Sequence, residues 1–290
     1  MIKRRTFLRL LGTGLAAGAV GWTLGAGAAW SQGLQDEGIR LACLSDAHLG
    51  QGPAGRLAAG HLEAAVAEIN ALEPPVDLVF FLGDLTQAGD PWAWQLGQEI
   101  LAGLRAPCFT LPGEHDPAPQ ARGEGGPQRG VFSFGWRGIH CLGLDSRLSP
   151  RAGTFGLTPP LLTWLAQELA HLSPDTPLLL LTHAPLYPLY IPWGWQTVGV
   201  EPLWDLLRPR PQVLLLHGHV HQTSRLEWES WHHLGVPATA WAYPAVQMGT
   251  TAVRPAPLAE ASRSGRGWLL LALSKNGGWR GQAKVWPPAG

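Results

Sequence analysis

Short apolar runs recur along the chain, and a polar or glycine-containing stretch follows each of them. A continuous apolar run of about four to eight residues is typical of a strand that is buried on both faces of a sheet. This pattern predicts strands over residues 39–44, 76–82, 107–111, 178–181 and 213–216.

Between these runs, other segments carry the signals of helices. A capping residue followed by proline begins two of them, at Asp90-Pro91 and Thr158-Pro159, and a shorter one is expected over 202–207. One more is predicted by an apolar stripe at helical spacing that a proline pair ends: Leu62, Ala65, Val66, Ile69 and Leu72. Strands that alternate with helices predict parallel pairing and right-handed crossovers.

Two stretches instead predict antiparallel hairpins. Residues 131–134 and 139–144 flank a glycine-bounded turn, and Asn276-Gly277 joins 268–273 to 282–286. No linker-like change of composition divides residues 38–290. We therefore predict one α/β domain there (α+β in some schemes), a four-layer sandwich of two mixed sheets flanked by helices.

The N-terminus differs from the rest of the chain. Lys3-Arg4-Arg5-Thr6-Phe7-Leu8-Arg9 precedes a mildly apolar stretch that ends near Trp30. This segment looks like a twin-arginine (Tat) export signal, so we expect a signal peptide over residues 1–29 and a linker over 30–37. The resemblance implies the Tat translocase as a partner and a periplasmic or extracellular location. The alternative is a signal that stays uncut and anchors the protein to the membrane.

Composition narrows the function classes. Charged residues make up 14% of the chain and the formal net charge is zero. No long basic run follows the first ten residues, so no nucleic-acid binding is expected. The three cysteines, Cys43, Cys108 and Cys141, lie in predicted strands and are expected to be free core residues. The sequence leaves the oligomeric state open.

Polar side chains follow the five strands, at the point where each strand ends. Open α/β sheets place their sites at this carboxyl edge, so we expect these side chains to form one cluster. Carboxylates and imidazoles are ligands for divalent metals that act on phosphate, and an aspartate can bridge two such ions. The candidate residues are Asp46, His48, Asp84, Glu114, His115, Asp116, His183, His219 and His221.

These motifs, in this order and spacing, resemble the calcineurin-like metallophosphoesterase family over nearly all of residues 38–290. The family includes cyclic-nucleotide phosphodiesterases, acid phosphatases and nucleotidases. The resemblance implies two divalent ions (Mn, Fe, Zn or Co). It implies a first metal held by Asp46, His48 and His221, a bridging Asp84, and a second metal held by Glu114, His183 and His219.

The resemblance also implies a phosphoesterase in which a metal-bound hydroxide attacks in line with the leaving group, and the N-terminal segment predicts that this enzyme is exported. His115 would contact the phosphoryl group and protonate or stabilise the leaving oxygen, and Asp116 would orient its ring. Either a phosphodiester or a phosphomonoester is open as the substrate. A diester is favoured, because no basic cluster is ready to neutralise a dianionic monoester.

One position departs from the resembled family, which usually has asparagine where this chain has Glu114. A glutamate adds negative charge, so it should bind metal more tightly and attract an anionic substrate less. A rival interpretation is therefore a cell-envelope metal-binding protein of the same fold with weak or no catalysis.

An aromatic, proline-rich loop follows His183 directly. Tyr187, Trp193 and Trp195 are candidates for a wall of the substrate pocket. The alternatives are contact with a membrane surface and packing on the domain itself. His217, just before the last motif, is expected to pack in the strand or to support the metal ligands.

Overall fold

The computed structural model describes residues 38–117, 130–148, 154–187, 195–228, 230–243, 265–274 and 276–286. The predicted signal and linker, and Trp193 of the aromatic loop, lie outside these residues.

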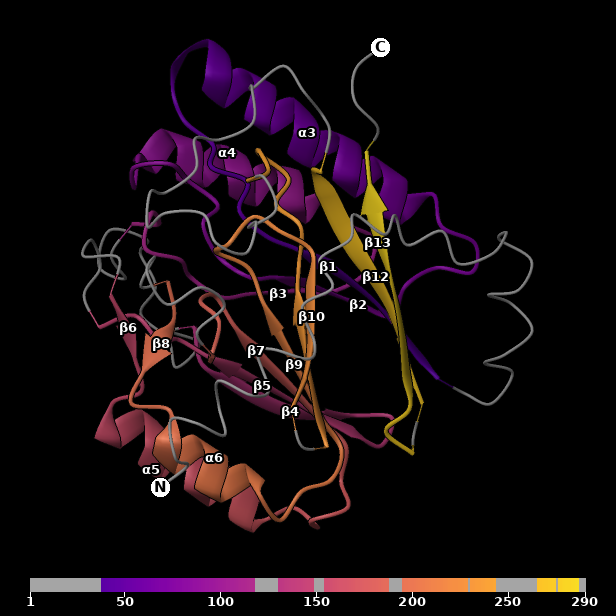
Figure 1. The fold of residues 1–290 in the computed structure, drawn as a ribbon. Coiled ribbons are helices and arrows are strands. Elements are labelled where there is room, and N and C mark those ends of the chain that lie inside the picture. Colours follow the sequence, from indigo (N-terminus) through magenta and orange to yellow (C-terminus); the bar gives the residue numbers. More distant parts are fainter. Residues whose placement is uncertain are drawn as a thin grey trace, which may run out of the picture.

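Two mixed sheets form the centre of the molecule (Figure 1). The first sheet has the order β13-β12-β1-β2-β3, with β1 parallel to β2 and β2 parallel to β3. Its strands are β1 (Ile39–Leu44), β2 (Leu78–Phe81), β3 (Cys108–Thr110), β12 (Gly267–Leu273) and β13 (Trp279–Val285).

The second sheet has the order β10-β11-β9-β7-β5-β4, with parallel pairs in its middle and an antiparallel pair at each edge. Its strands are β4 (Phe132–Trp136), β5 (Ile139–Leu144), β7 (Leu178–Thr182), β9 (Val213–His217), β10 (Ser224–Trp228) and β11 (Trp231–Gly235). A small separate pair joins β6 (Phe155–Gly156) to β8 (Thr197–Val198).

Helices cover the outer face of each sheet (Figure 1). α3 (Gly52–Asn70) and α4 (Pro91–Ala102) lie over the first sheet, and α5 (Pro159–Ala170) and α6 (Glu201–Leu207) lie over the second. The predicted caps are present, since Asp90 accepts the backbone N–H groups of Trp92 and Ala93, and Thr158 accepts that of Leu161. The predicted four-layer sandwich is confirmed.

Alternation along the strands explains the long apolar runs. In β1, Leu41 and Cys43 join the core between the sheets, whereas Ala42 and Leu44 pack under α3 and α4. In β7, Leu179 faces the same central core while its neighbours pack under α5 and α6. Each strand is therefore apolar on both faces.

The sequence predicts the hairpin of β12 and β13 but not the hairpin of β10 and β11. The Asn276-Gly277 turn joins β12 to β13 as predicted, with Leu273 opposite Trp279. The hairpin of β10 and β11 was not predicted individually, because neither strand is a continuous apolar run and β11 contains the pair His232-His233. All three cysteines are free, as expected.

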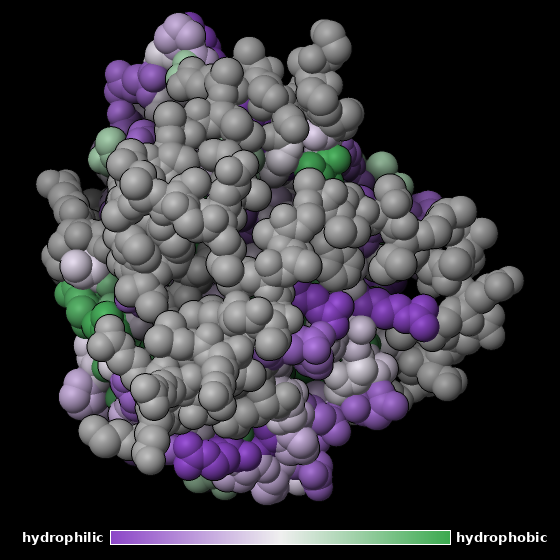
Figure 2. Space-filling view, viewed as in Figure 1, coloured by the Kyte–Doolittle hydropathy of each residue, from purple (hydrophilic) through white to green (hydrophobic). Residues whose placement is uncertain are grey.

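None of the helices among the described residues combines the length and the apolar character needed to cross a bilayer. On the face shown in Figure 2, the described surface is largely hydrophilic, with small hydrophobic areas.

Candidate metal centre

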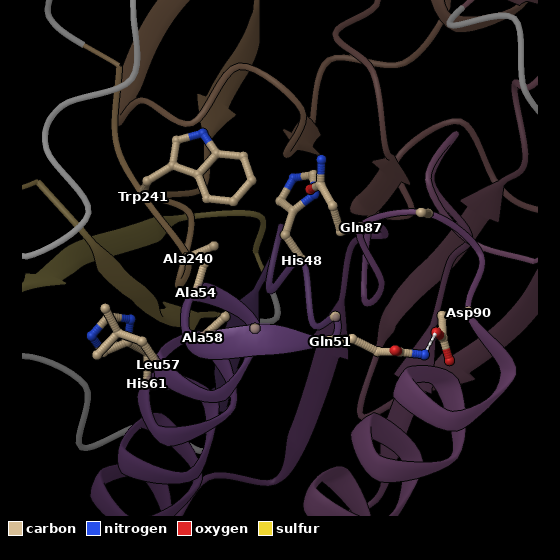
Figure 3. Close-up of a pocket in the computed structure, with 13 residues that line it drawn as sticks. His48, Gln51, Ala54, Leu57, Ala58, His61, Gln87, Asp90, Ala240 and Trp241 are labelled. Carbon is tan, nitrogen blue, oxygen red and sulfur yellow. Dashed lines mark hydrogen bonds between the residues drawn. The ribbon is translucent and has the colours of Figure 1, made fainter.

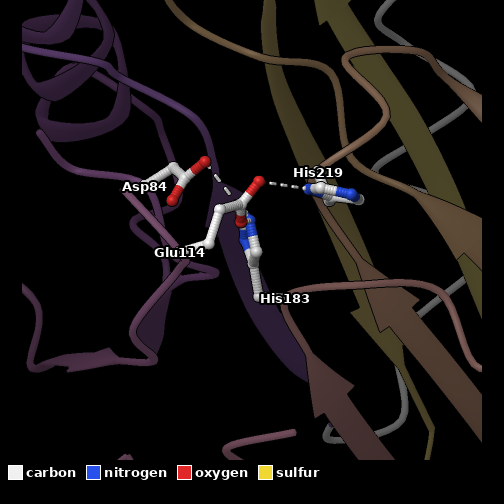
Figure 4. A group of neighbouring side chains, drawn as sticks. All are labelled: Asp84, Glu114, His183 and His219. Atoms are coloured by element: carbon white, nitrogen blue, oxygen red, sulfur yellow. Dashed lines mark hydrogen bonds and ion pairs between the residues drawn. The ribbon is translucent and has the colours of Figure 1, made fainter. Parts of the chain in front are cut away.

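The loops that follow β1, β2 and β3 of the first sheet meet those that follow β7 and β9 of the second, at the ends of these strands. Within each group of candidate ligands, one ligand atom per residue lies within 4.8 Å of all the others. The first group is Asp46, His48 and His221, and the second is Asp84, Glu114, His183 and His219 (Figure 4). A third group, His48, Asp84 and His115, overlaps both.

An unusual backbone conformation positions most of these side chains. The φ angles of Asp46, His48, Asp84, His219 and His221 lie between 48° and 64°, in the left-handed region. Residues other than glycine seldom adopt it, at a cost of about 1–3 kcal/mol each. Asp46 and His48 lie two residues apart, the spacing of side chains on one side of a strand. Instead, both follow β1 in strained turns.

Two glycines allow these turns to approach one another. A Cβ atom on Gly218 would collide with the Ser45 hydroxyl and reach 2.7 Å from Asp46 Oδ2. A Cβ atom on Gly113 would collide with the Asp84 carboxylate. Only glycine fits at such close contacts, as the motifs indicate.

The first group brings two imidazoles together. His48 Nε2 lies 3.0 Å from His221 Nε2, and Asp46 Oδ1 lies 3.4 Å from His221 Nε2. His221 Nδ1 lies 2.8 Å from the Trp241 carbonyl oxygen, which can only accept, so Nδ1 carries the proton. In the neutral ring, Nε2 then presents a lone pair to the group, as in a metal-binding histidine.

In the second group, too, a backbone carbonyl orients an imidazole. His183 Nδ1 donates to the Leu82 carbonyl oxygen over 2.6 Å. Its Nε2 lies 2.9 Å from Glu114 Oε2 and 3.4 Å from Asp84 Oδ2. The other oxygen of Glu114 lies 3.0 Å from His219 Nδ1 (Figure 4). When the His183 ring is neutral, as in a metal-binding histidine, its Nε2 lone pair faces these two carboxylates, so a cation between them would relieve the repulsion.

The electrostatics of the site favour positive charge. Burial works to lower the pKa of His183, but Asp84 and Glu114 raise it well above its ordinary value. Burial works to raise the pKa of Asp46, but His221, His183 and His48 lower it. The donor set and its charge therefore fit divalent metal ions.

His115 occupies the position expected of a group that meets substrate. Its side chain is 39% exposed, and its ring lies 5.0 Å from that of His48. Nδ1 donates to the Gln87 carbonyl oxygen over 2.6 Å, which leaves Nε2 as the atom able to exchange a proton with substrate.

The expected role of Asp116 in orienting His115 is corrected by the structure. The Asp116 carboxylate accepts the backbone N–H groups of Asp84, Thr86 and Gly113 at 2.9–3.0 Å. Asp116 therefore holds together the two loops that carry Asp84 and Glu114, and the Gln87 carbonyl orients His115. Burial and the Asp84 charge raise the pKa of Asp116 to about 6.

The aromatic loop also differs from expectation. Tyr187 is only 5% exposed, and its hydroxyl lies 3.1 Å from His217 Nε2, so it does not form a pocket wall. His217 Nδ1 in turn donates to the Gly218 carbonyl over 2.9 Å, so His217 supports the last ligand turn. Trp195 does reach the site, where its ring lies 5.7 Å from that of His219.

Trp241 is a site residue that sequence reasoning missed. Its indole stacks on the His48 ring, with 4.3 Å between centroids, and its carbonyl accepts the His221 proton. The residue lies outside every ligand motif, and the sequence around it carries no signal that predicts this position.

Comparison with known proteins fits this geometry. A family model described as calcineurin-like phosphoesterase matches residues 39–223, a span that includes every candidate ligand. The chain belongs to the calcineurin-like phosphoesterase family. A dimetal phosphatase from Danio rerio has the same fold, with a TM-score of 0.58, 14% identity, and coverage of 88% of this chain and 98% of that one.

Curated relatives of this calcineurin-like phosphoesterase carry phosphodiesterase names. A 3',5'-cyclic-nucleotide phosphodiesterase from Nostoc sp. is 28% identical over 83% of this chain and 90% of that protein. A 3',5'-cyclic adenosine monophosphate phosphodiesterase from Escherichia coli is 32% identical over 69% of this chain and 76% of that protein. The chain is accordingly a hydrolase of a metal-dependent phosphoesterase family.

Proposed function

We propose that the protein is a dinuclear metal-dependent phosphodiesterase. The observation that carries this proposal is the place of Asp84 between the two ligand groups. Its Oδ2 atom lies 3.6 Å from His48 Nε2 in the first group and 3.4 Å from His183 Nε2 in the second. A carboxylate shared in this way suits two ions held close together.

The protein's own residues have distinct tasks in such a reaction. When bound, divalent ions would polarise the phosphoryl oxygens and make water a better nucleophile. The carboxylates of Asp46, Asp84 and Glu114 balance part of their charge. Water forms the new P–O bond and releases a proton to solvent as the bond to the leaving oxygen breaks. That oxygen takes a proton from Nε2 of a doubly protonated His115 ring, which is left neutral with its Nδ1 proton still on the Gln87 carbonyl.

A diester is the proposed substrate class. A diester carries one negative charge, whereas a dianionic monoester carries two. Arg147, which contacts the Gly113 carbonyl, is already paired with Asp145 through two hydrogen bonds, so its charge is not available for the second charge of a monoester. The two relatives named for cyclic-nucleotide hydrolysis also support diesters.

The test uses the purified chain with added Mn, Fe, Zn or Co. We expect bis(p-nitrophenyl) phosphate to be hydrolysed with a higher kcat/KM than p-nitrophenyl phosphate. Asp84→Ala should lose both metals and activity, whereas the exposed control Asp175→Ala should keep both. Full metal content and turnover in Asp84→Ala would overturn the two-metal assignment.

We also propose that the protein is exported by the twin-arginine route. Its support is the arginine pair Arg4-Arg5, followed by Phe7 and Leu8 and then an apolar stretch. The enzyme would then act on esters outside the cytoplasm.

A further inference from the structure

A cavity of about 400 Å³ opens beside the metal centre (Figure 3). It lies between the start of α3, the loop that leads into α4, and the segment around Trp241. Its walls include one metal-ligand candidate, His48, which connects the cavity to the site.

The cavity lies on the side of His115. The Gln87 carbonyl that orients the His115 ring belongs to a residue that lines the cavity. His48, whose ring stands edge to face with that of His115 at 5.0 Å, lines it as well. His115 does not itself line the cavity, but its neighbours His48 and Gln87 do, so the cavity lies within one residue of the group that gives up the proton.

The lining has two chemical characters. Ala54, Leu57, Ala58, Ala240 and Trp241 supply apolar surface. A polar edge consists of Gln51, Gln87 and Asp90, in which Gln51 Nε2 donates to Asp90 Oδ2 over 2.6 Å (Figure 3). The imidazoles of His48 and His61 also line the cavity.

In the described part of the chain, the lining of the cavity carries a negative charge and no lysine or arginine to balance it. Among the described residues that line the cavity, Asp90 is the sole carboxylate, and neither lysine nor arginine occurs. Arg266 lies behind His61, 3.1 Å from its ring, and does not line the cavity. An anionic group would meet repulsion from Asp90, whereas a neutral group with a hydrogen-bond donor would meet an acceptor.

We propose that this cavity holds the leaving group of the diester and selects an uncharged organic group with an apolar body and a donor-bearing edge. The inference rests on the proposed function and adds a substrate preference to it. A volume of about 400 Å³ falls within the range of small-molecule sites, about 300–1,000 Å³, so it suits a ring system better than a short polyol.

The first test fills the cavity. Ala54→Phe places a ring in it from an exposed position of α3, and Ala67→Phe makes the same change at an exposed α3 position outside it. Methyl diesters with a p-nitrophenyl and a larger methylumbelliferyl leaving group serve as probes. In Ala54→Phe, kcat/KM for the larger ester should fall about tenfold more than for the smaller one. An equal loss for both esters, or the same pattern in Ala67→Phe, would overturn the proposal.

The second test changes the charge. Asp90→Asn removes the carboxylate but keeps a residue that caps α4 well. Methyl p-nitrophenyl phosphate is compared with the same ester carrying a carboxylate on its ring. The preference for the neutral ester should fall about fivefold in Asp90→Asn at low salt, and the difference between enzymes should shrink at high salt.

Different results would contradict the cavity preference and the phosphodiesterase activity. If the preference ratio is the same in the wild type and Asp90→Asn, the cavity does not select by charge and the inference is wrong. If the wild type hydrolyses none of these diesters with metal bound, the proposed function is wrong instead.

Discussion

Glu114 is the residue at which this chain departs from the pattern of the family it resembles. It gives one carboxylate oxygen to His183 and the other to His219, at 2.9 and 3.0 Å. As a ligand it would neutralise part of the second metal's charge. Glu114→Asn should therefore need more metal for half-maximal activity but reach an equal or higher saturated rate. Metal titration of activity measures both quantities.

The same variant separates two interpretations of Glu114. If the residue silences the site, the wild type is inactive and Glu114→Asn gains turnover. Equal metal affinity and stoichiometry in both proteins would mean that Glu114 does not touch the metal. The second ligand group would then have to be reassigned.

The exposed ring of His115 leads to another prediction at the residue scale. His115→Ala should keep its metals and lose about 10²–10⁴-fold in rate, as for removal of a general acid. The loss should shrink for leaving groups of low pKa, because these need little protonation. His171→Ala, a change at an exposed histidine at the end of α5, is the control. An equal loss for good and poor leaving groups would count against the acid role.

At the scale of elements, the sequence shows where strands end but not how the following turns are shaped. The sequence predicts β1 and β7 because both faces of each strand are buried, which makes their runs apolar throughout. The sequence does not predict the left-handed backbone of Asp46 and Asp84, because tertiary contacts impose this conformation on residues that seldom adopt it. Trp241 is equally hidden, because its place depends on packing between distant segments.

The contact between Tyr187 and His217, the last residue of β9, is expected to stabilise the fold. Tyr187→Phe removes the hydroxyl that contacts His217 Nε2 in the interior. It should lower the free energy of unfolding by about 1–3 kcal/mol, because a buried polar atom loses its partner. Ser224→Ala, which removes the longer contact at 3.4 Å, should cost less. Urea unfolding compares the two, and an unchanged stability in Tyr187→Phe would show that His217 does not need this contact.

For the whole molecule, the candidate ligands connect the two sheets. Asp46 and Asp84 follow strands of the first sheet, while His183 and His219 follow strands of the second. Bound metal should therefore raise Tm, and at a concentration about 100 times Kd it adds about 2.7 kcal/mol. Calorimetry with and without a chelator measures the gain. Asp84→Ala should lose the gain, and an equal gain in that variant would place the stabilising metal elsewhere.

The last prediction concerns the route of the whole chain. A twin-arginine route is expected to carry folded proteins, which agrees with three free cysteines and with a metal site assembled from both sheets. Because the export receptor reads the two arginine side chains, Arg4→Lys with Arg5→Lys should trap a folded precursor inside the cell. Fractionation with an antibody and a metal-dependent activity assay locates the protein. Lys3→Arg, which leaves the pair intact, should be exported. Normal export of the double variant would reject the twin-arginine route and favour an anchor or another pathway, without touching the assignment of the phosphoesterase site.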